Sequence, residues 1–117
     1  MIKLNIKPLS ANQAYSILKG RKVKTRQYNL YQDNVLIELI KQRIKIDLQK
    51  KESLFFYMKI GVSSRFDLDN AVKPFLDILQ KKFDFNDNQI RKIELEKEIV
   101  QKGKEFIEFI LEPNDME

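Results

Sequence analysis

The strongest constraint on the fold of this chain is a short, nearly continuous apolar run. It reads "SLFFYMKIGV" and covers residues 53–62. Its length and its aromatic content favour a β-strand over a helix. Because consecutive apolar positions bury both faces of a strand, this segment is predicted to lie in the centre of a sheet.

The segments around this strand show alternating or helical periods. Residues 1–7 alternate between apolar and polar side chains, which predicts a half-buried strand, whereas residues 29–45 and 72–83 repeat their apolar side chains at helical spacing. Residues 92–99 alternate again, and an apolar segment follows after Gly103, which predicts a closing β-hairpin. The order strand, helix, strand, helix, strand, strand predicts an α+β fold, a single mixed sheet with two helices packed on one face.

The length of 117 residues, 43% of them hydrophobic, fits one domain covering residues 1–117. Residues 8–28 sustain no period, and "KGRKVKTR" at residues 19–26 is interpreted as a basic, mobile loop. Residues 112–117 are expected to form a frayed tail.

Charge and composition limit the binding partners, the catalytic groups and the metal ions that are compatible with this chain. Residues 1–59 hold 13 basic and 4 acidic side chains, and residues 60–117 hold 9 and 13, for a net charge of +5. A basic half suits a polyanion, and an acidic half suits a metal ion. The sequence has no Cys and no His, so catalysis has to use carboxylates, Lys, Tyr, Ser or Thr, and a metal would be a hard cation such as Mg²⁺. No apolar run indicates a membrane span or leader, so a cytoplasmic protein is expected.

The stretch "RFDLDNAVKP" follows the central strand directly. If it is still extended, Asp67 and Asp69 point to the same side while Leu68 turns to the core. Two neighbouring carboxylates repel each other unless a cation lies between them. Asn70 is expected to cap the next helix, and Lys73 lies one helical turn after Asp69. Pro74 predicts that this helix starts irregularly.

A third carboxylate, Asp87, comes twenty residues after Asp67, beyond the second helix. It shares a site with the first two only if the chain folds back along that helix, and we expect the three carboxylates to converge. The alternative is that the aspartates serve only as helix caps and turn formers.

The segments "DLDNAVKPFLDIL" and "FNDNQI" together resemble the RusA-type Holliday junction resolvases. The family signature is Asp-x-Asp-Asn at the start of a helix, a lysine four residues after the second Asp, and an acidic turn past the helix. "KPLSANQAY" and "YQDNV" are similar to the family's early loop and first helix. The resemblance covers most of the chain in the family's order and spacing.

The resemblance implies a homodimeric Mg²⁺-dependent endonuclease, with Mn²⁺ as a substitute, that resolves four-way DNA junctions by paired symmetric nicks in recombination and repair. It implies that Asp67, Asp69 and Asp87 bind the metal and are catalytic together with Lys73. Asn86 stands where the family has the first acid of its acidic pair. Asn70 and Asn86 are therefore expected to support the metal ligands rather than bind the ion.

Contacts with the DNA backbone are expected from basic side chains near the site and in the loop: Lys19, Arg21, Lys22, Lys24, Arg26 and Arg65. Tyr15 and Tyr28 border this loop and either stack on splayed bases or anchor the loop. Two other functions remain open at this point: a non-catalytic basic nucleic-acid-binding module, and a basic interaction protein that binds no DNA.

Overall fold

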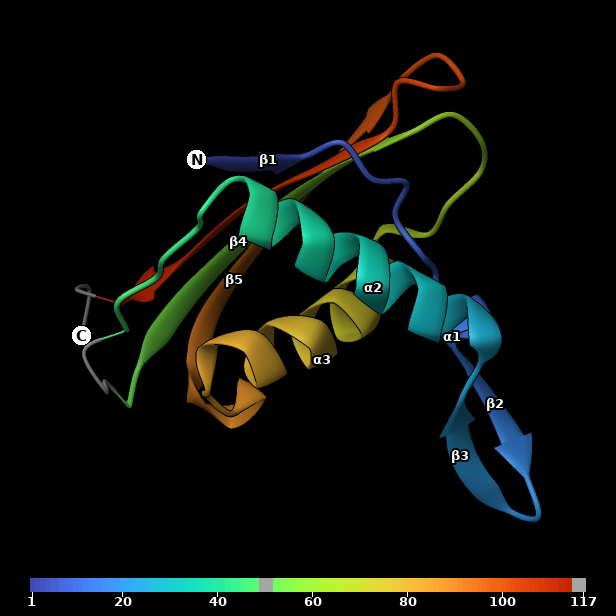
Figure 1. Cartoon of the computed structure of the whole chain (residues 1–117), viewed down its shortest axis with the longest axis horizontal. Helices are drawn as coiled ribbons and strands as arrows, with labels where there is room; N and C mark the ends of the chain where they lie inside the picture. Colours follow the sequence, from blue (N-terminus) through green and yellow to red (C-terminus); the bar gives the residue numbers. More distant parts are fainter. Residues whose placement is uncertain (49–51, 115–117) are drawn as a thin grey trace.

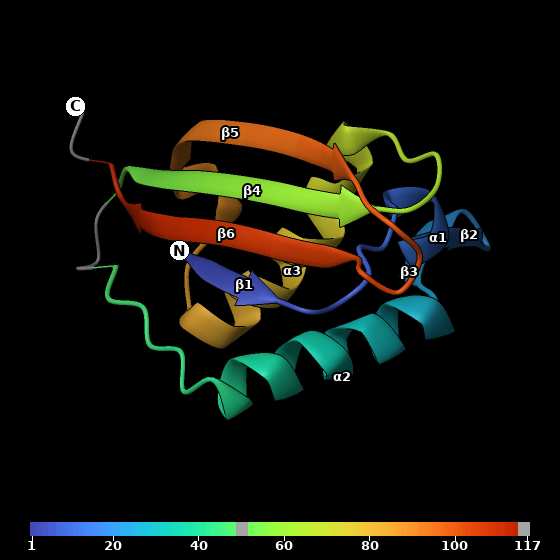
Figure 2. The same ribbon diagram turned by 90° about the horizontal axis from the view of Figure 1, so that it is seen from above.

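A four-stranded mixed sheet forms the body of the protein, with the two long helices on one of its faces (Figures 1 and 2). The computed structural model describes residues 1–48 and 52–114. Its main elements are β1 (Ile2–Leu4), α2 (Arg26–Lys41), β4 (Leu54–Val62), α3 (Val72–Phe83), β5 (Ile90–Ile99) and β6 (Phe106–Pro113). This sequence of main elements and the packing of both helices on one face confirm the predicted fold class.

Burial agrees with the role predicted for the apolar run. In β4 the side chains of Leu54, Phe56, Met58 and Ile60 have no exposed surface. They pack in one core cluster with the buried faces of the two helices. These faces include Val35 and Leu39 on α2, and Phe75 and Leu79 on α3. Phe75 packs edge-on against Phe109 of β6 at a ring distance of 5.1 Å. The central strand predicted at residues 53–62 is therefore confirmed.

The predicted closing hairpin is wrong. The strand order is β1-β6-β4-β5, so β5 pairs in parallel with one edge of β4, and β6 pairs antiparallel with the other. Gly103 does lie in the connection, at φ +90°, but this connection carries the chain across the end of β4. The physical reason is the difference in polarity. The apolar β6 gains more from a central place, whereas the Glu- and Lys-rich β5 remains largely exposed and suits an edge.

The predicted basic loop is also folded. Residues 8–28 contain a short helix α1 (Ala11–Ala14) and a two-stranded hairpin, β2 (Tyr15–Leu18) with β3 (Arg21–Lys24). Lys19 and Gly20 both have positive φ, at 52° and 75°, which is the backbone of a tight two-residue hairpin turn. Figure 1 shows this hairpin projecting away from the sheet.

Helix α2 starts and ends earlier than residues 29–45. Thr25 caps its first turn, accepting a hydrogen bond from the Tyr28 backbone N–H and donating one to the Gln13 carbonyl oxygen. The chain leaves the helix at Gln42 and adopts a left-handed backbone at Arg43.

The strand predicted at residues 1–7 is shorter than expected, and only Ile2–Leu4 pairs, with β6. The tail predicted at residues 112–117 begins too early, because β6 continues to Pro113; residues 115–117 lie outside the described part. None of the helices in the described segments is long and apolar enough to cross a membrane.

Candidate active site

The stretch after β4 forms a turn of 3₁₀-helix rather than an extended segment. This turn, η1, covers Leu68–Ala71 and follows Asp67, whose backbone is still extended. Asp69 therefore lies within the turn, and the strand alternation expected for Asp67 and Asp69 does not apply. Both aspartates are exposed, whereas Leu68 packs against the core as predicted.

Asn70 does not cap the second helix. Its backbone N–H donates to the Asp67 carbonyl oxygen within η1, and α3 begins after Ala71 without a side-chain cap. Pro74 falls in the first turn of α3, where a backbone N–H has no partner inside the helix and the proline costs little. Because the 3₁₀ turn η1 runs directly into α3, the predicted irregular start of this helix is confirmed, but Pro74 itself occupies a position that tolerates proline.

A cleft of about 350 Å³ lies beside Asp67. Its other lining residues come from the N-terminal segment and from the end of the β4 connection, and include Lys7, Asn12, Gln13, Arg65 and Asn70. The segment "KPLSANQAY" is thus next to the first aspartate of "DLDN". Arg65, predicted to contact DNA, lies here and not with the hairpin lysines.

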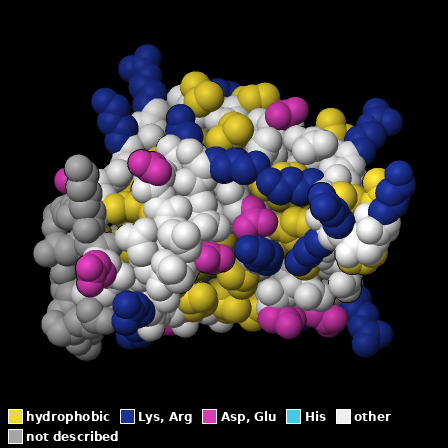
Figure 3. All heavy atoms as spheres, turned by 90° about the horizontal axis from the view of Figure 1, so that it is seen from below, with side chains coloured by type: hydrophobic (Ala, Val, Ile, Leu, Met, Phe, Trp, Pro, Cys, Tyr) yellow, Lys and Arg dark blue, Asp and Glu magenta, His cyan; other side chains and the backbone are white. Residues whose placement is uncertain are grey.

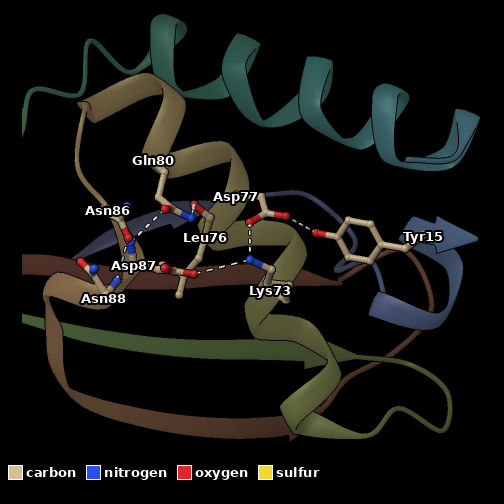
Figure 4. A network of polar contacts seen from close by, with 8 residues as sticks. All are labelled: Tyr15, Lys73, Leu76, Asp77, Gln80, Asn86, Asp87 and Asn88. Atoms are coloured by element: carbon tan, nitrogen blue, oxygen red, sulfur yellow. Dashed lines mark hydrogen bonds and ion pairs between the residues drawn. The ribbon is translucent and has the colours of Figure 1, made fainter. Parts of the chain in front are cut away.

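Lys73 joins two carboxylates that are far apart in sequence. Its Nζ lies 3.0 Å from Asp77 Oδ1, one turn further along α3, and 3.4 Å from Asp87 Oδ2, beyond the helix (Figure 4). These contacts raise the pKa of Lys73, with the Asp77 hydrogen bond as the main cause and burial acting in the opposite direction. Lys73 is therefore an ammonium cation at neutral pH.

The chain brings Asp87 back to Lys73 by folding along α3. Asp84 ends the helix with a left-handed backbone, at φ 54°, and a second 3₁₀ turn, η2 (Asp87–Gln89), follows. The Asp87 backbone N–H donates to Gln80 Oε1 at 2.9 Å, which fastens η2 to the last turns of α3. Figure 4 shows the carboxylates of Asp77 and Asp87 approaching the Lys73 ammonium from two different directions.

Asn86 stabilises this turn. Its Oδ1 accepts a hydrogen bond from the Asn88 backbone N–H at 3.0 Å, and its own N–H donates to Gln89 Oε1 at 2.7 Å. This reciprocal pair is a capping box for η2. An aspartate at this position would accept the same bond, so the change from the family's acid to an amide preserves the local structure.

Sequence reasoning did not identify Asp77, and it considered Tyr15 only for base stacking or for anchoring the loop. The Tyr15 hydroxyl, at the start of β2, donates to Asp77 Oδ2 and so links the hairpin to α3. Burial, followed by this hydrogen bond to a carboxylate, strongly raises the pKa of Tyr15 and keeps its hydroxyl protonated. The four-residue spacing from Lys73 to Asp77 was a usable signal, but the Tyr15 contact spans 62 residues and has no local signature.

The three predicted metal ligands do not form a preassembled cluster. No group of three or more Asp, Glu, His or Cys side chains placed to hold a metal ion occurs in residues 1–48 and 52–114. The structure instead brings together Asp77, Lys73 and Asp87, with Asp67 beside the cleft. The expected convergence of Asp67, Asp69 and Asp87 is not seen.

The basic residues predicted to bind DNA lie mainly on the hairpin. Lys19 and Gly20 form its turn, Arg21, Lys22 and Lys24 lie on β3, and Arg26 begins α2. Lys22 Nζ lies 4.4 Å from the centre of the Tyr15 ring. Tyr15 is half-buried and Tyr28 is fully buried, so both anchor the hairpin, and base stacking by the Tyr28 ring is ruled out in this conformation.

The family model for endodeoxyribonuclease RusA matches residues 5–109. The chain belongs to the RusA endodeoxyribonuclease family. The match covers the cleft, the hairpin, Lys73, Asp77 and Asp87, so all parts of the site lie inside the RusA domain. A comparison with curated proteins found no match to the sequence.

Proposed function

We propose that this member of the RusA family resolves four-way (Holliday) DNA junctions by paired symmetric nicks, in recombination and repair. The observation that carries the proposal is the contact of Lys73 with Asp87, because it joins the two halves of the family signature across the whole length of α3. Membership of an endodeoxyribonuclease family makes a purely non-catalytic binding module the weaker reading.

Lys73 is proposed as a catalytic residue that stabilises negative charge on the scissile phosphate. A lysine that is protonated at neutral pH acts electrostatically and does not act as a general base. Asp77 is proposed as a positioning residue, since its side chain is only 16% exposed and is held between Lys73 and Tyr15. Tyr15 in turn fixes the orientation of Asp77.

The carboxylates of Asp67, Asp69 and Asp87 are proposed as catalytic ligands of Mg²⁺, with Mn²⁺ able to substitute. The donor chemistry fits, because carboxylate oxygens suit hard cations and all three side chains are exposed; since they are not clustered in this structure, binding of an ion would have to draw them together. Asp87 also holds Lys73 loosely, because 3.4 Å exceeds the usual length of a charged hydrogen bond. A bound ion would supply an activated water and neutralise phosphate charge. Asn70 and Asn86 are proposed to support the ligands from η1 and η2.

Backbone binding is proposed for the basic hairpin, through Lys19, Arg21, Lys22, Lys24 and Arg26, and for Arg65 at the cleft. The protein is proposed to act as a homodimer, because the two scissile phosphates of a junction are related by a two-fold axis and an isologous dimer presents two matching sites.

The test is cleavage of an end-labelled synthetic four-way junction, with Mg²⁺, Mn²⁺ or EDTA. We expect paired nicks at symmetric positions with either metal, none with EDTA, and none with Asp69→Asn. Asp33→Asn, an exposed aspartate on α2, is the matched control and should cut normally. Tight junction binding without nicking under any divalent ion would favour the binding module instead, and absence of binding even at low salt would favour an interaction protein that binds no DNA.

A further inference from the structure

Two lysines from separate elements meet over one buried aromatic ring, outside the Lys73 contacts. Lys24 Nζ on β3 lies 4.9 Å from the centre of the Tyr28 ring, and Lys81 Nζ near the end of α3 lies 5.7 Å from it. Tyr28 has no exposed surface, although both lysines are exposed. The two ammonium groups therefore lie against the ring, as in cation–π contacts, while both lysine side chains remain open to solvent.

These two ammonium groups are not neutralised locally. Within the described residues, neither Lys24 nor Lys81 has a carboxylate at ion-pair distance, and Lys81 Nζ instead donates to Gln32 Oε1 at 3.0 Å. The nearby Asp77 already binds Lys73 and Tyr15. The contact between the two amines lowers the pKa of Lys81, first through their hydrogen bond, then through burial and the like charge of Lys24, and the same hydrogen bond raises the pKa of Lys24. A bound anion would relieve this repulsion.

The pair lies on the same stripe of α3 as the proposed catalytic lysine. Lys73, Asp77 and Lys81 follow one another at four-residue steps, so each side chain is a neighbour of the next along the helix surface. Eight residues at a rise of ~1.5 Å separate Lys73 from Lys81 by about 12 Å along the axis. Figure 3 shows Lys and Arg side chains gathered on this side of the molecule, toward the hairpin.

We propose that Lys24 and Lys81 form a two-lysine site for a backbone phosphate of the DNA strand that enters the active site. The site deepens the proposed function, on which it rests, by adding Lys81 on α3 to the binding surface of the hairpin. Two ammonium groups on one phosphate give affinity without reading sequence, as a structure-selective nuclease requires.

The test is equilibrium binding of a fluorescent four-way junction in EDTA, which prevents cutting, across a series of salt concentrations. We expect Lys24→Gln and Lys81→Gln each to weaken binding several-fold and to lower the slope of log affinity against log salt by about one. The double variant should lose less than the product of the two single losses, because both lysines hold the same phosphate.

Lys82→Gln is the matched control, since it removes the same charge from the next residue of α3, which is also exposed but points about 100° around the helix. Equal losses of affinity and slope for Lys81→Gln and Lys82→Gln would overturn the site, because general electrostatics would then explain both. Thermal unfolding tests the folded state: Lys81→Gln should leave Tm nearly unchanged, since it removes the repulsion from Lys24 together with the hydrogen bond to Gln32 and the contact with the Tyr28 ring, and a clearly lowered Tm would assign the lysine to structure.

The outcomes separate this site from the nuclease proposal. Binding losses specific to Lys24 and Lys81 in a protein that never nicks DNA would keep the phosphate site and remove the nuclease. Normal binding by Lys81→Gln in a protein that nicks junctions would remove the phosphate site and keep the nuclease.

Discussion

The two carboxylates that contact Lys73 differ in distance and in exposure, and these differences suggest different roles for Asp77 and Asp87. Asp77 Oδ1 is the closer partner at 3.0 Å and its side chain is 16% exposed, whereas Asp87 Oδ2 is at 3.4 Å with 43% exposure. A short contact in a sheltered position fixes orientation, and a long contact in an open position leaves the carboxylate free to bind another cation. Asp77 is thus suited to hold the lysine, and Asp87 to exchange it for a metal ion.

Replacing Asp77 by Asn keeps the shape of the side chain but removes its charge. We expect the single-turnover nicking rate of Asp77→Asn to fall about tenfold, or ~1.4 kcal/mol in the barrier, because Lys73 loses its orientation. Junction affinity in EDTA should change little. Tyr15→Phe should show a smaller fall in the same direction, since it removes only the hydrogen bond that orients Asp77. A drop in affinity with an unchanged rate would contradict a positioning role.

The ionisation of Lys73 predicts how stability depends on pH. Its pKa is raised in the folded state, so the stabilisation is complete below the unfolded-state pKa of ~10.4 and is lost as pH rises through the folded-state pKa. We expect the difference in free energy of unfolding between the unaltered protein and Lys73→Met to be constant from about pH 7 to 9, well below that pKa. The difference should shrink above about pH 10.5. Urea unfolding at each pH measures it, and a difference that already vanishes at pH 8 would show that Lys73 loses its proton early.

At the scale of elements, periodicity predicted the helices and the central strand because each buries one stripe or both faces. It could not assign partners to β5 and β6, since local alternation is the same whether two strands pair with each other or with a third. The useful signal was polarity: "FIEFIL" is too apolar for an edge, and "KIELEKEI" too charged for a centre. Local patterns also could not predict that Asp87 lies next to Lys73, since this placement depends on the hydrogen bond to Gln80 and on the left-handed backbone of Asp84.

Because β4 pairs with β6, Gly61 is expected to tolerate no larger side chain. Gly61 lies opposite Phe106, and a Cβ there would overlap the Phe106 ring, whose neighbour is the Lys3 ammonium at 4.6 Å. We expect Gly61→Ala to lower the free energy of unfolding by about 1–3 kcal/mol through overpacking. Adding Phe106→Leu should recover part of the loss by making room. Chemical denaturation of the single and double variants measures both effects, and a Gly61→Ala protein as stable as the unaltered one would refute the close approach.

At the scale of the whole molecule, one copy carries one set of Lys73, Asp77 and Asp87. Paired nicks therefore require two copies, and we expect light scattering to give about twice the chain mass of 14.0 kDa at the concentrations that cut junctions. Mixing active protein with excess Asp69→Asn should then give junctions nicked in one strand only. A monomeric mass under cutting conditions, with paired nicks retained in the mixture, would reject the dimer.

The projecting hairpin has a fixed base and a free tip. At the base, Tyr15 pairs with Lys24 and bonds Asp77, whereas Ile17 and Leu18 near the tip are 71% and 60% exposed. Adding two residues on each side of the Lys19–Gly20 turn would keep the alternation of side chains and leave the base in register. With the hairpin binding the DNA backbone as proposed, its reach along a DNA arm is adjustable separately from the Lys73, Asp77 and Asp87 contacts, because a change of length at the tip leaves the base in register.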